Sequence, residues 1–123
     1  MKKSTLFCDI DGTLFHYRKF TTYKSTKPDK IVENINAINK AYDNGHYILL
    51  TTARPEYLRV HTMKELDEAN VQYHKIIMGI ARGTRLLIND NEEEHINRAY
   101  AINVTRNSEF TPKQMDLFDS ITK

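Results

Sequence analysis

The chain has 123 residues, a formal net charge of +2, and 40% hydrophobic and 28% charged residues. This length suits one soluble domain with a single core, over residues 1–123, and so small a charge does not by itself indicate a nucleic-acid-binding protein. The single cysteine excludes an internal disulfide framework, and the scattered histidines lack the spacing of a zinc site. Because no apolar run is long enough to span a membrane or to form a signal peptide, we expect a cytoplasmic protein with no membrane partner.

Short apolar runs alternate with amphipathic stretches along the chain, which predicts a parallel sheet covered by helices. Residues 4–9 predict the first strand. Residues 14–27 follow it without any period and predict an irregular excursion or a small hairpin. A helix is then predicted from Pro28 to the Asn44-Gly45 pair, because isoleucines recur there at steps of three and four.

The second half of the chain continues this alternation. Residues 47–51 predict a second strand, and Pro55 begins a second helix that runs to Ala69. Three further strands and a short helix are expected, the strands at residues 75–78, 85–88 and 100–104 and the helix at residues 92–98. Residues 107–123 predict a polar tail with a turn at 115–118. The expected fold is a three-layer α/β/α, Rossmann-like domain with about five strands in a mainly parallel sheet.

The acidic pair Asp9 and Asp11 ends the first expected strand, and Gly12 then allows a sharp turn. Two carboxylates this close at the end of a buried strand repel each other, so a cation or a ligand is needed to compensate their charge. The second strand also ends in polar residues, Thr51-Thr52, and so does the fourth, in Asn89-Asp90. Since ligands bind beyond the carboxyl ends of parallel strands, we expect these residues to share a pocket.

Phosphoryl transfer with Mg²⁺ is the chemistry that fits these residues. Asp9 is expected to attack phosphorus as a nucleophile, which gives an aspartyl-phosphate, and Asp11 to protonate the leaving oxygen and then to activate water. Thr52 and the backbone near Ala53 are expected to bind phosphate oxygens. Asp9, the main-chain carbonyl of Asp11 and the carboxylate of Asp90 are expected to hold the metal.

This arrangement resembles the haloacid dehalogenase superfamily of aspartate-nucleophile phosphohydrolases, over about residues 4–105. Residues 9–13 match the family's first motif, Asp-x-Asp-Gly-Thr. Residues 48–52 match its second motif, an apolar strand ending in Thr, and residues 86–90 match its fourth, an apolar strand ending in an acid. The Thr-Ala-Arg run at 52–54 looks like the family's frequent Thr-Gly-Arg. The resemblance implies substrate contacts from the first two motifs and from the excursion, namely Gly12, Thr13, Thr51, Ala53, Arg54, Arg18 and Lys19.

Two positions depart from the family pattern. Asn89 stands where many relatives carry a second acid, which leaves Asp90 for the metal and gives Asn89 at most a bracing or water-holding role. The third motif is a basic residue that neutralises charge on phosphorus, and the sequence offers three candidates for it. Arg82 is preferred because it lies in a connection that leaves the active-site end, and Arg85 or Lys75 would replace it if that connection ran differently.

Neither gap between the motifs has room for the cap domain that many relatives carry, so an open, capless site is expected. Capless relatives act on large or exposed phosphates or borrow a neighbouring subunit as a lid, so a homo-oligomer stays open as an alternative. Residues 15–27 resemble the family's flap. Their interleaved basic and aromatic side chains suit an anionic sugar phosphate or a nucleic-acid end.

The leading interpretation is a Mg²⁺-dependent phosphatase that acts on a small phosphorylated metabolite such as a sugar phosphate. A polynucleotide 3′-phosphatase or nucleotidase is the first alternative, which the open site favours and the small net charge disfavours. A receiver-like signalling or binding domain, phosphorylated without turnover, is the second, and Thr52 at the end of the middle strand disfavours it because a receiver carries an aspartate there. The remaining alternatives are a structural acidic turn and a non-catalytic relic of an enzyme. The presence of Asp9, Asp11 and Asp90 argues against both.

Overall fold

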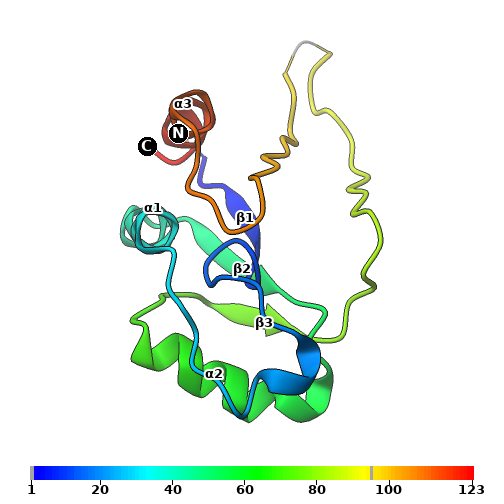
Figure 1. The fold of residues 1–123 in the computed structure, drawn as a ribbon. Helices are drawn as coiled ribbons and strands as arrows, with labels where there is room; N and C mark the ends of the chain where they lie inside the picture. The colour runs from blue at the N-terminus through cyan, green and yellow to red at the C-terminus, as the bar shows by residue number, and fades with distance from the viewer. Residues whose placement is uncertain (1, 95) are drawn as a thin grey trace.

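The structure is a computed structural model that describes residues 2–94 and 96–123. Its centre is a parallel sheet of three strands in the order β1 (Thr5–Asp9), β2 (Tyr47–Thr51) and β3 (Lys75–Ile77). Helix α1 (Val32–Asp43) connects β1 to β2. The 3-10 turn η2 (Glu56–Leu58) and helix α2 (Arg59–Glu68) connect β2 to β3, and helix α3 (Pro112–Ile121) lies near the end of the chain (Figure 1). The fold is therefore the α/β, Rossmann-like one that the sequence predicts.

The core lies between the sheet and the helices. Ile48 and Leu50 of β2 are fully buried, as alternate residues on one face of a strand are when a helix covers that face. Ile38 of α1, Leu66 of α2 and Phe118 of α3 pack into the same cluster. Within the described residues, no helix is long and apolar enough to cross a membrane.

Three predicted strands and two predicted helices are present, with shifted ends. Helix α1 begins at Val32 and not at Pro28, because the backbone before it is held extended by the excursion. The N–H of His16 donates to the carbonyl of Asp29, and the N–H of Ile31 donates to the carbonyl of Leu14. The excursion itself is irregular apart from the 3-10 turn η1 (Phe20–Thr22) and isolated bridges at Phe15.

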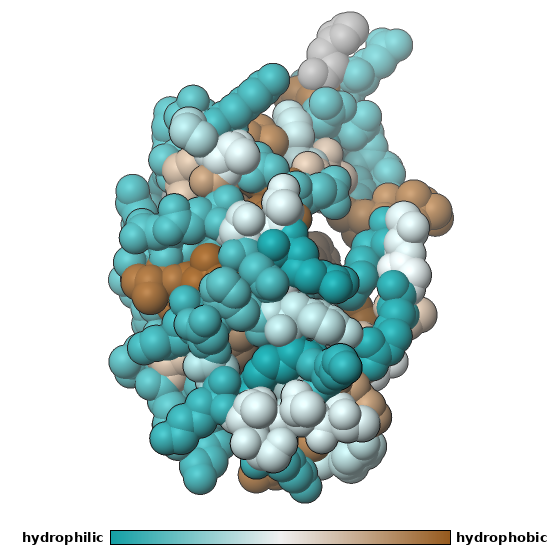
Figure 2. Space-filling model, viewed as in Figure 1, coloured by the Kyte–Doolittle hydropathy of each residue, from teal (hydrophilic) through white to brown (hydrophobic). Residues whose placement is uncertain are grey.

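The predicted strands at residues 85–88 and 100–104 and the predicted helix at 92–98 are wrong: the described residues there contain no strand or helix. His95, inside that predicted helix, lies outside the described residues. Residues 81–94 and 96–100, called the exposed segment below, leave the body of the protein as a long loop (Figure 1), and Leu86 is 81% exposed on it. Figure 2 shows an opening between this segment and the body, with hydrophobic atoms on its outer edge.

Geometry explains why residues 85–88 do not add a strand to β1. A parallel neighbour of β1 must begin at the amino end of β1. The guanidinium of Arg85 instead lies 3.7 Å from the carboxylate of Asp9, at the carboxyl end of β1, so the chain beyond Arg85 runs away from the sheet. Residues 86–88 are apolar, but the position of Arg85 at the carboxyl end of β1 does not allow them to pair with that strand.

The predicted polar tail is also wrong, because residues 112–121 form helix α3. Thr111 caps this helix: its hydroxyl accepts a hydrogen bond from the N–H of Gln114, whose side chain accepts one from the N–H of Thr111. Pro112 occupies the first helical position, which favours a helix start. The carbonyl of Thr122 then accepts a hydrogen bond from the side chain of Asn44, which joins α3 to the end of α1.

Candidate active site

The loop after β1 turns sharply around one carbonyl oxygen. The carbonyl of Ile10 accepts hydrogen bonds from the N–H groups of Thr13, Leu14 and Phe15 at 3.2, 2.8 and 3.1 Å. Gly12 sits inside this turn with a φ of +87°, a conformation that residues with a side chain rarely adopt. A Cβ at position 12 would also lie 3.2 Å from Cγ of Arg106, so the turn requires glycine.

Asp9 ends β1 with its side chain 39% exposed. The hydroxyl of Thr13 donates to its Oδ2 at 3.4 Å, and Arg85 is its ion-pair partner at 3.7 Å. Burial raises the pKa of the Asp9 carboxyl above its usual value; Arg85 opposes this effect, and the negative charge of Asp11 adds to it. A carboxylate with long, weak contacts on the open edge of the sheet is free to react or to bind a cation.

Asp11 is held quite differently, by a fully buried arginine. Nε and Nη2 of Arg54 donate to Oδ2 and Oδ1 of Asp11, both at 2.8 Å, in a bidentate pair. The hydroxyl of Tyr23 donates to Oδ2 of Asp11 at 3.1 Å, and its ring lies 4.0 Å from the guanidinium of Arg54. Burial is the larger cause and the negative charge of Asp11 the next one, and they raise the pKa of Tyr23 to about 12. The Tyr23 hydroxyl therefore stays protonated and acts as a donor.

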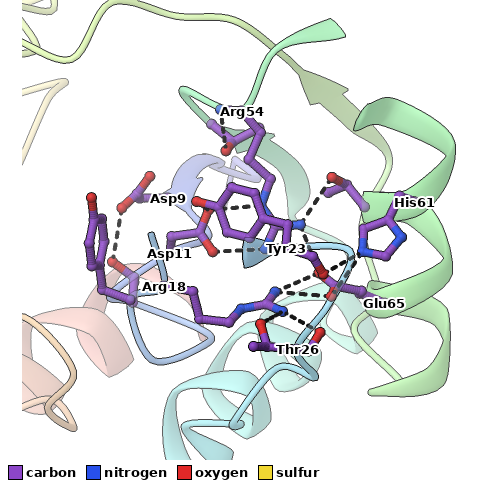
Figure 3. Close-up of polar contacts among 12 residues, drawn as sticks. Asp9, Asp11, Arg18, Tyr23, Thr26, Arg54, His61 and Glu65 are labelled. Atoms are coloured by element: carbon purple, nitrogen blue, oxygen red, sulfur yellow. Dashed lines mark hydrogen bonds and ion pairs between the residues drawn. The ribbon is translucent and has the colours of Figure 1, made fainter. Parts of the chain in front are cut away.

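The ion pairs continue inward from Arg54. Its Nη1 donates to Oε1 of Glu65 at 2.7 Å and to the hydroxyl of Thr62 at 3.1 Å. Nη2 of Arg18, from the excursion, donates to both oxygens of Glu65 at 2.8 and 3.0 Å. Asp11, Arg54, Glu65 and Arg18 thus form a buried charge chain of alternating sign (Figure 3). Burial opposes ionisation of Glu65, but the hydrogen bonds from Arg18 and Arg54 outweigh it and lower the pKa of its carboxyl.

Several residues that the sequence assigned to substrate binding have other partners here. Arg54 and Arg18 belong to the buried charge chain and point inward, so neither guanidinium faces the open edge. The hydroxyl of Thr52 is buried and accepts a hydrogen bond from the N–H of Arg54 at 3.1 Å. Thr51 pairs with Asp9 across the strands, and Lys19 is exposed just before η1.

Among the three candidates for the basic residue, the structure brings Arg85 to Asp9. Its guanidinium is the one that lies beside Asp9. The preferred candidate, Arg82, lies instead over the ring of Phe20, at 6.0 Å. Lys75 begins β3, opposite Leu49 and away from the carboxyl end of the strand. Arg85 can reach Asp9 because residues 85–88 do not form the predicted strand.

The structure does not bring Asp90 to the acidic pair. Its carboxylate, 77% exposed, pairs with Arg98 at 2.9 Å, and the side chain of Asn89 donates to its backbone carbonyl. Within residues 2–94 and 96–123, no three acidic, histidine or cysteine side chains are grouped to hold a metal. The donors that are present fit Mg²⁺ chemically, because the weakly paired Asp9 carboxylate and the loop carbonyls are hard oxygen ligands.

Sequence reasoning missed Arg106 and Asn107, which lie against the acidic loop. Cγ of Arg106 borders Gly12, and the N–H of Asn107 donates to the carbonyl of Gly12 at 2.8 Å. The side chain of Asn107 accepts a hydrogen bond from the N–H of Tyr17. Asn107 has a φ of +67°, and an Asn-Ser pair is a turn signal that could have marked this corner. Buried Asn34 of α1 braces it by donating to the carbonyls of Thr13 and Ser108.

The fold and this site define an α/β protein with an acidic Asp-x-Asp-Gly loop at the ligand-binding edge of a parallel sheet. The chain belongs to the haloacid dehalogenase-like hydrolases, since the model of that family matches residues 6–114. No curated protein matches it significantly. Among the described residues, the connection from β1 to β2 holds only η1 and α1 as regular elements, and the connection from β2 to β3 holds only η2 and α2, so neither contains an inserted domain.

Two solved structures share the fold. A chain of the Pnkp1/Rnl/Hen1 complex superposes with a TM-score of 0.57 at 19% sequence identity, over 68% of this chain and 30% of that one. The present chain therefore corresponds to less than a third of that protein. A target from Vibrio cholerae superposes with a TM-score of 0.52 at 17% identity, over 95% of this chain and 98% of that one.

Proposed function

We propose that this protein is a Mg²⁺-dependent phosphomonoester hydrolase in which Asp9 is the nucleophile. The observation that supports this proposal is the different surroundings of the two aspartates on one loop: Asp9 has weak partners on the open edge, whereas Asp11 is fixed by Arg54. A small phosphorylated metabolite such as a sugar phosphate is one candidate substrate, the one that the sequence favours.

In the first step, a carboxylate oxygen of Asp9 attacks phosphorus and the bond from phosphorus to the leaving oxygen breaks. Asp11, once it has taken up a proton from solvent, gives that proton to the leaving oxygen, which departs as an alcohol. In the second step, Asp11 takes a proton from water, whose oxygen attacks the aspartyl-phosphate, so that phosphate is released and Asp9 is restored. Arg85 lies close enough to Asp9 to offset negative charge on the phosphoryl oxygens.

The buried charge chain fixes the direction of the Asp11 carboxylate, so Asp11 has to exchange a hydrogen bond from Arg54 or Tyr23 before it can face the leaving oxygen. The planar fork of Arg54 allows one orientation of the Asp11 carboxylate, and Glu65 with Thr62 fixes that fork in turn. Arg18 ties Glu65 to the excursion. Arg54 and Glu65 are thus positioning residues, because in this arrangement they reach the substrate only through Asp11.

The metal would be held by the Asp9 carboxylate and the main-chain carbonyl of Asp11, with Asp90 as the third ligand that the sequence predicts. When bound, Mg²⁺ would supply positive charge that draws the phosphate toward Asp9 and offsets its repulsion from the carboxylates. Asp90 is now paired with Arg98 and would have to exchange that partner.

The proposal is tested by phosphate release from a panel of phosphomonoesters, including p-nitrophenyl phosphate, with Mg²⁺ or with excess chelator. We expect turnover that the chelator abolishes and that Asp9→Asn lowers by at least about 10⁴-fold, because an amide cannot attack phosphorus. Circular dichroism should show the fold of Asp9→Asn unchanged. Wild-type activity in that variant would refute the assignment of the nucleophile.

A polynucleotide 3′-phosphatase or nucleotidase is the second candidate. It is favoured by the exposed aromatic and arginine side chains at this edge of the sheet, which include Phe20, Tyr57 and Arg82. Both candidates use the same acidic loop. They differ in what must hold the part of the substrate beyond the phosphate.

A further inference from the structure

Three side chains meet where connections leave the carboxyl ends of the three strands. Phe20 lies on η1, after β1; Tyr57 lies on η2, after β2; and Arg82 follows β3. The rings of Phe20 and Tyr57 lie edge to face with centroids 6.4 Å apart, and the Arg82 guanidinium lies 6.0 Å from the Phe20 ring. Residues far apart in sequence thus form one cluster at the edge that carries Asp9.

A second pair of the same kind borders the acidic loop. The guanidinium of Arg106 lies 4.2 Å from the ring of Tyr17, and both side chains are exposed. Arg106 is also the residue whose Cγ lies against Gly12, between Asp11 and Thr13. The two clusters come from different parts of the edge, since η1 lies near the start of α2 and residues 105–107 lie beside β1 (Figure 1). Together, Tyr17, Phe20, Tyr57, Arg82 and Arg106 are called the aromatic rim.

Exposure and charge indicate what the aromatic rim would bind. Tyr57 is 71% exposed, and single exposed aromatic residues are common on protein surfaces. Here, however, three aromatic rings from two connections share one edge, and two of them, Tyr17 and Phe20, lie beside guanidinium groups. Among the described residues, neither Arg82 nor Arg106 has an acidic partner, so both charges are available to an anion.

Flat rings beside guanidinium groups suit bases and backbone phosphates, the two features that repeat along single-stranded nucleic acid. A sugar phosphate has one phosphate and no aromatic face. A mononucleotide would engage one cluster, whereas the two arginines, at different parts of the edge, suit a chain with several phosphates.

We propose that the aromatic rim binds single-stranded nucleic acid whose terminal phosphate lies at Asp9. This inference rests on the proposed function and selects nucleic acid from its two candidate substrate classes. Bases stack on Tyr57, Phe20 and Tyr17, and Arg82 and Arg106 contact phosphates of the backbone.

The test compares kcat/KM for 3′- and 5′-phosphorylated oligonucleotides, a hexose phosphate and p-nitrophenyl phosphate, all with Mg²⁺. We expect an oligonucleotide to be the best substrate, with a kcat/KM that falls as salt rises. Tyr57→Leu should lower the ratio of kcat/KM for that oligonucleotide to kcat/KM for p-nitrophenyl phosphate by about tenfold or more. Tyr100→Leu, a change of another exposed tyrosine outside the aromatic rim, is the matched control and should leave the ratio unchanged.

Binding measurements separate this inference from the proposed function. The anisotropy of a fluorescent oligonucleotide, titrated with Asp9→Asn, reports binding without turnover. We expect the double variant Asp9→Asn/Tyr57→Leu to bind about tenfold more weakly, whether or not the wild type hydrolyses any substrate. Equal binding by both variants, or a hexose phosphate as the best substrate, would overturn the inference. If the protein hydrolyses no phosphomonoester but Tyr57→Leu still weakens oligonucleotide binding, only the proposed hydrolase activity is refuted.

Discussion

Arg54 holds Asp11 with two parallel hydrogen bonds of 2.8 Å, although one residue follows β2 and the other follows β1. The guanidinium is fully buried, and Glu65 shares it from the opposite side. Two acids therefore face one buried cation, and a second cation, Arg18, faces the inner acid. The arrangement balances charge inside the protein, whereas Asp9 on the open edge has only longer contacts with Thr13 and Arg85.

Removing the buried cation should destabilise the protein strongly. In Arg54→Met, the carboxylates of Asp11 and Glu65 lose their shared partner inside the fold. Breaking a buried ion pair in this way costs about 3–5 kcal/mol, because a charge is left without compensation. Urea unfolding followed by circular dichroism measures the loss. Arg59→Met, which breaks an exposed pair with Glu56, is the matched control and should change the midpoint little. Equal effects from the two variants would contradict the importance of burial.

Glu65 should make stability depend on pH in the acidic range. The hydrogen bonds from Arg18 and Arg54 outweigh burial and lower the pKa of Glu65 in the folded state. Its contribution is thus complete above the unfolded pKa of about 4.5 and is lost as pH falls through the lower, folded pKa. Glu65→Gln lacks this contribution, so its free energy of unfolding should be lower near pH 7 and approach that of the wild type at acid pH.

The measurement is a series of urea unfolding curves between about pH 7 and pH 3. Glu68→Gln is the control, because that exposed acid lies on the same helix. His61, whose Nε2 lies 3.4 Å from Glu65, is present in all three proteins. A constant difference between Glu65→Gln and wild type over this range would contradict the prediction.

The sequence predicts β1, β2, β3 and most of α1 because burial imposes a period on those residues. Ile48 and Leu50 alternate with less buried neighbours, and Ile35 and Ile38 recur on one face of a helix. The same reasoning failed for residues 85–88. An apolar run indicates a tendency to be buried. Whether it becomes a strand depends on its position relative to the sheet, which is set by the preceding connection and cannot be predicted from the local pattern.

The candidate site, like the fold, could be predicted from the sequence only in part. Asp9 and Asp11 are marked by their position at the end of an apolar strand. The partners of Asp11 are not, because Tyr23, Arg54 and Glu65 come from three separate segments and meet only in the folded protein. The family resemblance of the Thr-Ala-Arg run at residues 52–54 predicts that Arg54 binds substrate. Its buried acidic partners, distant in sequence, turn the side chain inward instead.

Helix α3 shows that a missed element can still carry a readable signal. Thr111 and Gln114 satisfy each other's backbone N–H groups in a capping box. Thr111→Ala should therefore lower the free energy of unfolding by about 1 kcal/mol. Lys113→Ala, an exposed change in the first turn of the same helix, should alter it much less. The urea midpoints of the two variants test this prediction, and equal midpoints would argue against the cap.

Mg²⁺ should change the accessibility of the exposed segment if Asp90 is a metal ligand as the sequence predicts. The present partner of Asp90 is Arg98 in a solvent-exposed pair, and such pairs contribute only about 0–1 kcal/mol. A divalent cation at Asp9 can therefore draw Asp90 away from Arg98 at little cost, and it would hold the segment closer to the body. Trypsin should then cleave after Arg85 and Arg98 more slowly with Mg²⁺ than with chelator, as mass spectrometry of the fragments would measure. Mg²⁺ should no longer protect the segment from trypsin in Asp90→Asn. Protection should be kept in Glu92→Gln, which changes an exposed acid of the same segment that pairs with Lys2.

Equal protection in Asp90→Asn and wild type would show that Asp90 does not bind the metal.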